Sequence, residues 1–388
     1  MRVICFYLPQ YHPIPENDEW WGAGFTDWRK VATAQPRFRG HSQPHIPADL
    51  GFYDLRLEET RAAQAALAAE YRIAGFCYHH YWFNGRMLLD RPFNEVLASG
   101  RPDFPFCLCW ANETWTRRWD GREREILIRQ DYERYDAVAH VEWLEHAFRD
   151  KRYIKINEKP LFLVYRVDDI PNMREIIKAW RSYVENKGYP GLYLASVETW
   201  FTRLSPAAVS DLGFDVIIEF QPNIRKLAVR AKGRWTPANF MKSLFHKTTD
   251  MVGLEHVQRR EIMLKFDYRA MVEAFVASPR SPRKTFPCVM PSWDNTARKM
   301  VATVMQNEDA QLYEVWLRSA MERVVEYDQQ EQIVFINAWN EWAEGCHLEP
   351  DIRNGKKFLE ATRSVIEAFD EAGGHAAAGT SPSGLDKG

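Results

Sequence analysis

The stretch IVFINAWNEWAEG, residues 333–345, decides the fold class of this chain. Its first part, residues 333–338, is a continuous apolar run with the length of a buried strand, and polar side chains follow where that strand would end. Runs of the same kind recur upstream, at residues 3–8, 73–78, 106–110, 161–165, 192–197, 216–220 and 288–290. Strands that are apolar along their whole length are typical of parallel sheets covered on both faces.

Segments with helical spacing lie between many of these runs. They cover residues 57–71, 137–148, 173–186, 268–277, 308–327 and 357–372. The alternation predicts an α/β fold, and the count of eight strands favours a single (β/α)8 TIM-type barrel. The alternative is an open doubly wound sheet, which is disfavoured because no predicted strand is followed by a glycine-rich phosphate-binding turn.

Two segments depart from the alternating pattern. Residues 222–265 form a long insertion between the sixth and seventh strands, and the final segment, residues 373–388, is rich in Gly, Ala and Ser. We expect one catalytic domain over residues 1–372 and a disordered tail after it. Arg225, Lys226 and Arg230 of the insertion are candidates for binding an anionic group, although a solvated basic face is the simpler interpretation.

Composition narrows the function classes. The chain has 388 residues, with 51 Lys and Arg against 53 Asp and Glu, so its net charge is −2. A chain this close to neutral lacks the basic surface that a general nucleic-acid-binding protein requires. Its aromatic content is high, with 15 Trp, 16 Tyr and 22 Phe, which calls for an explanation beyond core packing.

Targeting signals are not evident in the sequence. The opening MRVICFYLPQYHPIPEN has no long apolar segment followed by a cleavage site, and no apolar stretch is long enough to span a membrane. Most of the six cysteines lie in apolar runs, which indicates buried free thiols rather than a disulfide framework. These features predict a cytoplasmic protein without a membrane span.

The residues just past each strand are the candidate site, because the active site of a parallel barrel lies at the carboxyl ends of its strands. Aromatic rings stack on the apolar faces of sugars, while carboxylates, amides and imidazoles hydrogen-bond their hydroxyl groups. This combination indicates an oligosaccharide or polysaccharide substrate. The candidate substrate-binding residues are Tyr11, His12, His79, His80, Tyr81, Trp82, Trp110, Asn112, Glu113, Tyr165, Glu198, Trp293, Asp294, Asn340 and Trp342. For Glu113, a salt bridge to Arg117 or Arg118 is an equally good interpretation.

Glu341 and Glu344 carry the strongest catalytic signal. They follow the eighth strand three residues apart, a spacing that places both side chains on one face if the chain turns helical there. Two close carboxylates can divide their roles, because one stays ionised while its neighbour and apolar walls raise the pKa of the other. Cleavage or formation of a glycosidic bond needs such a pair. The alternative is that both glutamates are solvated or helix-capping residues.

Several motifs resemble those of known families. The block Asn340-Glu341-Trp342-Ala343-Glu344-Gly345, followed by Leu348-Glu349-Pro350, resembles the N-E-W-x-E-G…E-P block of glycoside hydrolase family 99. Residues 1–370 as a whole are more similar to the WbsX family, related bacterial proteins found in polysaccharide gene clusters and often labelled glycosyltransferases. The matching motifs are residues 6–13 (FYLPQYHP), 20–22 (WWG), 24–28 (GFTDW), 75–83 (GFCYHHYWF) and 109–113 (CWANE).

The resemblance implies a mechanism. In glycoside hydrolase family 99 the first glutamate of the block removes a proton from the sugar's own 2-hydroxyl, which attacks the anomeric carbon and gives a 1,2-anhydro sugar. The second glutamate protonates the leaving oxygen and then activates water. By this match Glu341 is the base, Glu344 is the acid and base, and the anomeric configuration is retained. Ala343 departs from the family, where a larger polar residue is common. The resemblance implies no cofactor and no metal.

Three other functions remain open. The first is a glycosyltransferase or transglycosylase in O-antigen or capsular polysaccharide biosynthesis, because Glu341 and Glu349 have the E-x7-E spacing of some retaining transferases. The chain lacks the glycine-rich loop and the D-x-D motif that would accompany a nucleotide-sugar site. A metal-dependent barrel hydrolase would need an H-x-H pair on its first strand, where this chain has only His12. A non-catalytic carbohydrate-binding protein would use the aromatic residues without needing two close glutamates.

Overall fold

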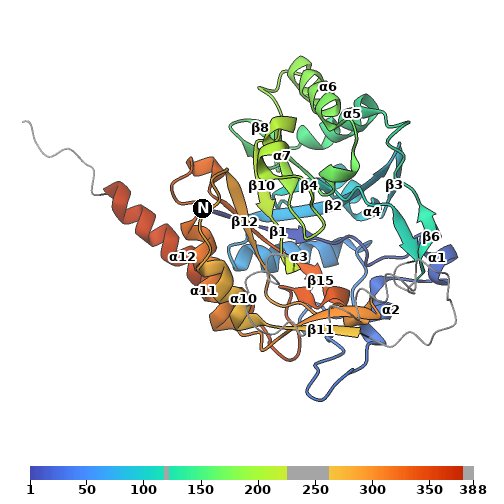
Figure 1. The fold of residues 1–388 in the computed structure, drawn as a ribbon, viewed down its shortest axis with the longest axis vertical. Coiled ribbons are helices and arrows are strands. Elements are labelled where there is room, and N and C mark those ends of the chain that lie inside the picture. The colour runs from blue at the N-terminus through green and yellow to red at the C-terminus, as the bar shows by residue number, and fades with distance from the viewer. Residues whose placement is uncertain (118–121, 225–261, 379–388) are drawn as a thin grey trace, which may run out of the picture.

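Eight parallel strands close into a barrel in the computed structural model, which describes residues 1–117, 122–224 and 262–378 (Figure 1). The barrel strands are β1 (Arg2–Tyr7), β2 (Gly75–Phe83), β4 (Phe106–Trp110), β8 (Lys159–Val164), β9 (Tyr193–Val197), β10 (Val216–Glu219), β12 (Thr285–Val289) and β14 (Ile333–Ile336). Each strand pairs in parallel with its neighbour in this order, and β14 pairs with β1 to close the ring. The predicted barrel and all eight predicted strand segments are therefore confirmed.

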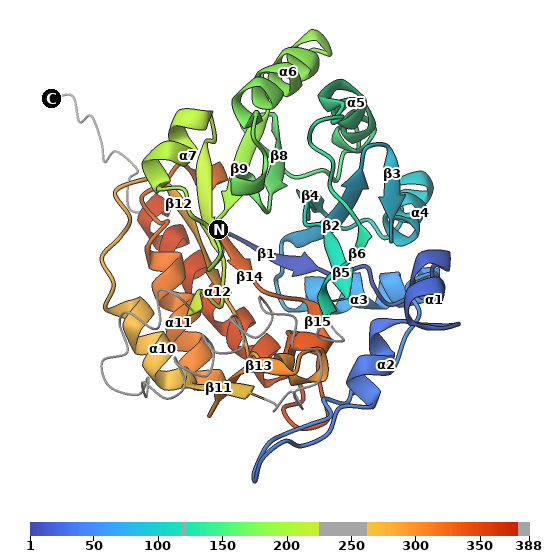
Figure 2. The same cartoon turned by 45° about the vertical axis from the view of Figure 1, so that its right-hand side comes forward.

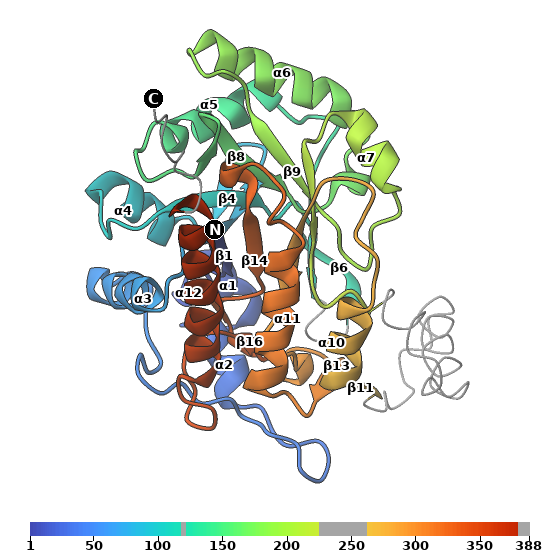
Figure 3. The ribbon, with the colours of Figure 1, turned by 90° about the vertical axis from the view of Figure 1, so that its left-hand side faces the viewer.

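Helices follow the strands and surround them, as Figure 2 shows. They are α3 (Glu58–Glu70), α4 (Arg91–Ser99), α5 (Ala137–Phe148), α6 (Met173–Asn186), α7 (Pro206–Leu212), α10 (Tyr268–Val276), α11 (Ala310–Glu322) and α12 (Lys357–Ala378). Figure 3 shows α10, α11 and α12 side by side on one flank of the barrel. The six predicted helices are confirmed. The short helices α4 and α7 were not predicted, because few residues carry a periodic signal in either.

Smaller elements complete the chain. Between β1 and α3 lie α1 (Pro15–Trp21) and α2 (Asp27–Ala32). The short strands are β3 (Arg86–Leu88), β5 (Trp115–Arg117), β6 (Arg122–Ile128), β7 (Lys155–Ile156), β11 (Ile262–Asp267), β13 (Val301–Gln306), β15 (Asn340–Glu341) and β16 (Cys346–His347). Single 3-10 turns cover Val167–Asp169, Asn295–Ala297, Gln329–Glu331 and Trp342–Glu344. The last of these turns lies between β15 and β16 and ends at Glu344, while Glu341 is the last residue of β15.

The barrel interior is aromatic. Phe6 of β1 stacks on His79 of β2 and meets Phe220, which follows β10, edge to face at 5.1 Å. Since β1 and β10 are not neighbours in the sheet, these rings can meet only inside the barrel. Tyr165, just past β8, contacts both His79 and Phe220. This cluster forms a floor of packed rings beneath the carboxyl ends of the strands.

The predicted insertion and tail fall largely outside the described residues. Residues 225–261, which include Arg225, Lys226 and Arg230, lie outside them, and the part of the insertion that is described forms β11 beside β13. Helix α12 continues to Ala378, and residues 379–388 lie outside the described chain, so the disordered tail stays a prediction. Within the described ranges, every helix is too short or too polar to cross a lipid bilayer.

Candidate active site

The chain after β14 places Glu341 and Glu344 together. Beyond Ile336 it runs through β15, turns in the 3-10 helix Trp342–Glu344 and returns as β16, with Glu341 paired to Cys346. Glu341 precedes this helix and Glu344 ends it, and both carboxylates contact the same nitrogen of Arg298, so the two side chains project to the same side. The sequence predicted this common face, although the turn is a 3-10 turn and not an α-helix.

Arg298 joins the two carboxylates. Its Nη1 lies 3.1 Å from Oε2 of Glu341 and 3.2 Å from Oε1 of Glu344. The two oxygens share one nitrogen, so they are separated by no more than the sum of these distances, and one sugar residue can touch both. The other terminal nitrogen of Arg298 contacts the carboxylate of Asp27, at the start of α2.

Sequence reasoning missed Arg298 and Asp27 as site residues. Asp27 lies within the family motif at residues 24–28, and this motif was the signal that could have identified it as a site residue. Arg298 had no comparable signal, because it comes from the chain after β12 and meets Glu341 only in the folded protein.

Burial and neighbouring charges raise the pKa of two carboxyl groups in this cluster, those of Glu341 and Asp27. Burial, followed by the negative charges of Glu344 and Asp27, raises the pKa of Glu341 to about 8, and Arg298 opposes the rise. Burial also raises the pKa of Asp27, again against the influence of Arg298. The side chain of Glu344 is 20% exposed, compared with 10% for Glu341. The cluster thus holds a proton near neutral pH, as acid–base catalysis requires.

Three predicted substrate-binding residues instead hold the turn in place. Asn340 accepts a hydrogen bond from the backbone of Leu8 at 2.7 Å and donates one back at 3.0 Å. The hydroxyl of Tyr11 donates to the carbonyl of Asn340 and accepts from the backbone N–H of Trp342. The indole of Trp342 donates to Glu349 at 2.6 Å. These buried contacts fix the backbone from which Glu341 projects.

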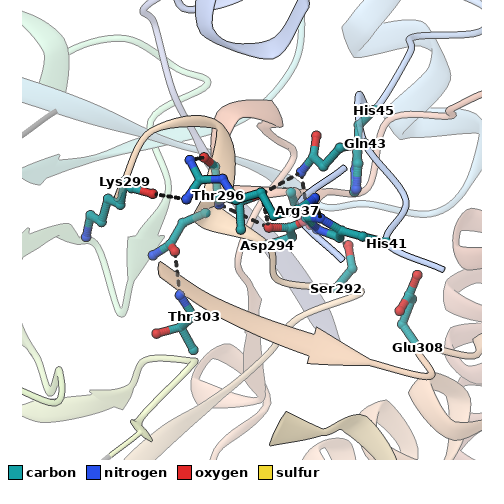
Figure 4. A network of polar contacts seen from close by, with 12 residues as sticks. Arg37, His41, Gln43, His45, Ser292, Asp294, Thr296, Lys299, Thr303 and Glu308 are labelled. Atoms are coloured by element: carbon teal, nitrogen blue, oxygen red, sulfur yellow. Dashed lines mark hydrogen bonds and ion pairs between the residues drawn. The ribbon is translucent and has the colours of Figure 1, made fainter. Parts of the chain in front are cut away.

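Asp294, another predicted sugar ligand, also has a supporting position (Figure 4). One of its oxygens lies 2.6 Å from Nε2 of His41 and accepts from Gln43 at 2.7 Å, and the other accepts from the backbone and hydroxyl of Thr296. Burial alone would raise the pKa of Asp294, but the hydrogen bonds from His41 and Thr296 outweigh it and lower that pKa. The backbone N–H of Asp294 donates to the carbonyl of Glu344 at 2.7 Å, so this network positions Glu344.

Gly345 allows this close approach, and its replacement gives a first prediction. A Cβ at Gly345 would lie 2.8 Å from Cβ of Asp294 and 2.9 Å from its backbone, at a φ of +56°. Gly355 has the same φ with no atom within 4 Å, so it is a matched control. We expect Gly355→Ala to cost about 1 kcal/mol of unfolding free energy and Gly345→Ala roughly 3 kcal/mol or more, measured by denaturant titration. Equal losses would show that the contact with Asp294 is unimportant.

The charges of the cluster around Arg298 act on three predicted aromatic residues of the barrel interior and its rim, His79, Tyr81 and Tyr165. Burial, with a smaller contribution from the charge of Arg298, lowers the pKa of His79 to about 4, so this ring is neutral. Burial and then the charge of Glu341 raise the pKa of Tyr81, while burial followed by the charges of Glu113 and Glu344 raises that of Tyr165. The three side chains are therefore electrostatically coupled to the cluster, and their contact with a substrate stays a prediction.

Glu113 and Asn112 lie at the end of β4. Glu113 pairs with Arg166 at 3.3 Å, whereas the sequence suggested Arg117 or Arg118 as its partner. The side chain of Asn112 accepts from the backbone N–H of Arg166 and donates to the hydroxyl of Tyr132. Glu113 is partly exposed and remains available to a ligand, whereas Asn112 is buried and holds the chain that follows β8.

Other candidates lie away from the carboxylate pair, which corrects the predicted site. His80 lies 3.0 Å from His140 of α5, Trp82 stacks on the same ring, and Trp110 packs against Trp180 of α6. Side chains alternate along a strand, so His79 and Tyr81 face the barrel interior while His80 and Trp82 face the helices. Predicting all four residues at the site ignored this alternation.

Three further candidate substrate-binding residues, His12, Glu198 and Trp293, each lie in a different environment. His12 is buried near Asp54 and Arg56, and burial lowers its pKa to about 4. Glu198 lines a cavity with Glu219, beside α10, and Trp293 is buried.

Glu349, the second glutamate of the E-x7-E spacing, is a buried structural acid. It accepts hydrogen bonds from the hydroxyl of Tyr53, the side-chain amide of Gln64 and the indole of Trp342. Burial raises its pKa to about 7, against these hydrogen bonds. Its partners belong to the layer between the barrel and α3, so this geometry gives no support to the E-x7-E interpretation.

The structure resembles solved glycoside hydrolases. It matches the glycoside hydrolase family 99 endo-α-mannosidase from Bacteroides thetaiotaomicron, solved with Bis-Tris-propane, with a TM-score of 0.57 at 13% identity over 96% of this chain and 98% of that one. A second structure of an enzyme of that description from the same organism gives 0.55, and a glycoside hydrolase-like protein gives 0.54 at 12% identity. At such low identity these matches establish a shared fold.

The sequence itself has closer relatives. The chain is 39% identical over 367 residues to a protein described as "Uncharacterized protein WxcX" from Xanthomonas campestris pv. campestris strain B100, and 38% identical to the protein of that description from strain ATCC 33913. Each alignment covers 94% of this chain but 49% of the relative, so the chain spans about half the length of the curated relatives it matches. The family model described as "Glycosyltransferase WbsX" matches residues 3–362, and the chain therefore belongs to the WbsX family.

Proposed function

We propose that this protein is a retaining glycoside hydrolase that cleaves an α-linked oligosaccharide or polysaccharide with Glu341 and Glu344. The observation that carries the proposal is the contact of both carboxylates with one nitrogen of Arg298, at 3.1 and 3.2 Å, with the pKa of Glu341 raised to about 8. A pair of carboxylates this close, one of them with a raised pKa, is what cleavage of a glycosidic bond requires.

The roles follow the match to glycoside hydrolase family 99. Glu341, the first glutamate of the block, is the base and in its ionised form removes the proton of the substrate 2-hydroxyl. The resulting oxygen attacks the anomeric carbon and closes a 1,2-anhydro ring as the bond to the leaving oxygen breaks. Glu344, the more exposed group, donates its proton to that oxygen and later takes one from the attacking water. Glu341 then returns the proton to the 2-hydroxyl, so protons balance over the cycle.

Transfer to a second sugar is the alternative proposal, and the description of the matching family model favours it. The first half of the reaction would be the same, and a sugar hydroxyl would replace water as the acceptor. Activity that depends on a nucleotide sugar would be a different reaction, for which the buried hydrogen bonds of Glu349 give no support. We keep the predicted cytoplasmic location as part of this proposal.

Product analysis tests the proposed function. We expect the protein to release sugar from one member of a panel of α-linked oligosaccharides and polysaccharides, with the first product formed in the α configuration when followed by NMR. The variant Glu344→Gln should be inactive under the same conditions. Initial release of the β anomer would contradict the 1,2-anhydro intermediate, and activity only in the presence of a nucleotide sugar would contradict hydrolysis.

The pH dependence of kcat/KM tests whether the two glutamates share one proton. The proposed reaction needs Glu341 ionised and Glu344 protonated, so the active form of the pair carries a single proton. The pKa of Glu341 is raised to about 8, so the pair keeps this proton up to about that pH. We therefore expect kcat/KM to fall as the pH rises through about 8, well above the usual range for a glutamate. A kcat/KM that stays constant or rises through this region would contradict a shared proton.

A further inference from the structure

A second cluster of polar side chains lies beside the turn Trp342–Glu344, here called the catalytic turn, and has no part in the proposed reaction. It contains His45, from the segment after α2, His347 of β16 and Asp351. Nδ1 of His45 lies 2.9 Å from Nε2 of His347, and that nitrogen lies 3.8 Å from Oδ2 of Asp351. All three candidate ligand atoms lie within 4.8 Å of one another, and His347 and Asp351 are buried.

The ring of His347 is fixed with a lone pair facing the cluster. Its Nδ1 lies 2.9 Å from the carbonyl oxygen of Glu349, which can only accept, so Nδ1 carries the hydrogen. In the neutral ring Nε2 then carries its lone pair on the side of His45 and Asp351. Burial lowers the pKa of His347 to about 4, which keeps the ring neutral. A backbone carbonyl that orients a histidine in this way is the usual outer contact of a metal ligand.

Asp351 is oriented in the same sense. Its Oδ1 accepts from the backbone N–H groups of Arg353 at 2.8 Å and Asn354 at 2.6 Å. Its Oδ2 is the oxygen near His347, and it accepts one hydrogen bond from the side chain of Asn354 at 3.1 Å. The backbone hydrogen bonds to Oδ1 thus fix the orientation of the carboxylate. Oδ2, which faces the two histidines, can accept a further hydrogen bond or bind an ion.

Backbone pairing assembles the cluster without any ligand. The N–H of Ile352 donates to the carbonyl of Ile46, and the N–H of Ala48 donates to that of Pro350. Pro47 and Asp351 form a β-bridge between these two hydrogen bonds. The segment that carries His45 is therefore joined to the one that carries Asp351, so little chain ordering would remain to be done on binding.

We propose that His45, His347 and Asp351 form a binding site for a divalent transition-metal ion, with Zn²⁺ as the best fit. Zinc takes nitrogen and oxygen ligands at about 2.0–2.2 Å in tetrahedral geometry, which places neighbouring ligand atoms about 3.3 Å apart. The separations of 2.9 and 3.8 Å lie on either side of that value. Two imidazoles and one carboxylate suit zinc better than calcium or magnesium, which prefer all-oxygen sites. The fourth position would be taken by water.

The ion would stabilise the catalytic turn by joining the two chain segments that contact it. The segment that carries His45 also carries His41 and Gln43, which bind Asp294, whose backbone N–H donates to Glu344. On the other side, His347 stacks on Trp342 at 3.7 Å, and Trp342 lies between the two glutamates in sequence. Joining His45 to His347 would thus fix both segments that position Glu344, without the ion touching the substrate.

The alternative is a plain hydrogen bond in which Nδ1–H of His45 donates to Nε2 of His347. Metal binding and this hydrogen bond compete for the same lone pair, so direct titration distinguishes them. The test uses tag-free protein stripped with a chelator and then titrated with Zn²⁺ by calorimetry, and with Co²⁺ by visible absorption, because tetrahedral Co²⁺ has strong d–d bands. We expect one equivalent to bind and the melting temperature to rise with zinc.

Variants locate the ion. His45→Ala removes a partly exposed ligand, and Asp351→Asn keeps the oxygen that accepts from the backbone while changing the one that faces the histidines. We expect each to weaken Zn²⁺ binding by roughly 100-fold or more and to abolish the Co²⁺ bands. His146→Ala, an exposed histidine of α5, is the matched control and should bind as the wild type does. Absence of binding by folded wild-type protein, or equal affinity in all variants, would overturn the proposal. If His45→Ala fails to fold, Asp351→Asn alone decides the outcome.

Discussion

Replacing either Glu341 or Glu344 by glutamine is expected to reduce turnover by about 1,000-fold or more while the protein stays folded. Glutamine preserves the shape of the side chain but neither accepts nor donates the proton that each step requires. Because the two groups act in one reaction, the double variant should be little worse than either single variant. The measurement is kcat on the substrate identified by the panel.

The two variants should differ in their response to the leaving group. A substrate with a good leaving group, such as an aryl glycoside or a glycosyl fluoride, needs no protonation of the departing atom. The first step of Glu344→Gln should therefore recover on such a substrate, whereas Glu341→Gln should stay inactive because the 2-hydroxyl still has to lose its proton. A 2-deoxy substrate should not react with the wild type. Turnover of a 2-deoxy substrate would contradict the 1,2-anhydro intermediate.

Stability provides an independent measurement on Glu341. Its pKa is raised from the ordinary 4.5 to about 8 in the folded protein, so the folded state binds the proton more tightly than the unfolded chain does. The stability that this proton contributes is present at low pH and is lost as the pH rises from the ordinary value through about 8. At about pH 9 Glu341→Gln should therefore be more stable than the wild type by a few kcal/mol, because no buried charge has to form.

Glu331 provides the matched control for both measurements. It is a buried glutamate just before β14, whereas Glu341 follows that strand, so the two lie at opposite ends of the barrel. It accepts from Tyr193 and pairs with Lys284, contacts that stabilise the fold at the face remote from catalysis. Glu331→Gln should lose stability while kcat stays within about threefold of the wild type. Equal activity losses in Glu331→Gln and Glu341→Gln would indicate that turnover simply follows stability.

The sequence predicted the barrel because its signals are local. A buried parallel strand is apolar at every position, and each predicted run, from residues 3–8 to 333–338, is recognisable without knowing its neighbours. The common face of Glu341 and Glu344 is also local, since it depends on a spacing of three residues. Features that depend on a few neighbouring residues were therefore within reach of sequence analysis.

The remaining parts of the site depend on contacts distant in sequence. Arg298, which follows β12, meets Glu341 beyond the neighbouring strand β14, and Asp294 is held by His41, 253 residues away in the chain. Asn340 and Trp342 are polar or aromatic residues at a strand end, as expected of ligand contacts, yet their hydrogen bonds go to Leu8 and Glu349. Residue type and position alone do not distinguish a side chain that binds substrate from one that holds the chain around it.

Arg298→Met is expected to be the most destabilising of the proposed substitutions. The guanidinium is buried among the carboxylates of Asp27, Glu341 and Glu344, and methionine would leave those carboxylates without its positive charge. Removing one partner from a buried ionic cluster costs about 3–5 kcal/mol. Because Arg298 lowers the pKa of Glu341, its loss should raise that pKa further and move the midpoint of kcat/KM to higher pH. Arg298→Lys should recover only part of the stability, since one ammonium cannot match the geometry of three carboxylates.

The stability penalty of Arg298→Met should also depend on pH, which separates a charge effect from a packing effect. At low pH the carboxylates take up protons and need the cation less, so the penalty should be smaller at about pH 5 than at about pH 9. Arg61→Met is the control, because Arg61 is equally buried but pairs with a single, partly exposed carboxylate of Glu95, and its penalty should vary little with pH. Adding Asp27→Asn to Arg298→Met should restore part of the lost stability by removing one of the carboxylates left without a partner. A pH-independent loss, or no gain from the second substitution, would mean that Arg298 contributes through packing and does not set the charges of Glu341 and Glu344.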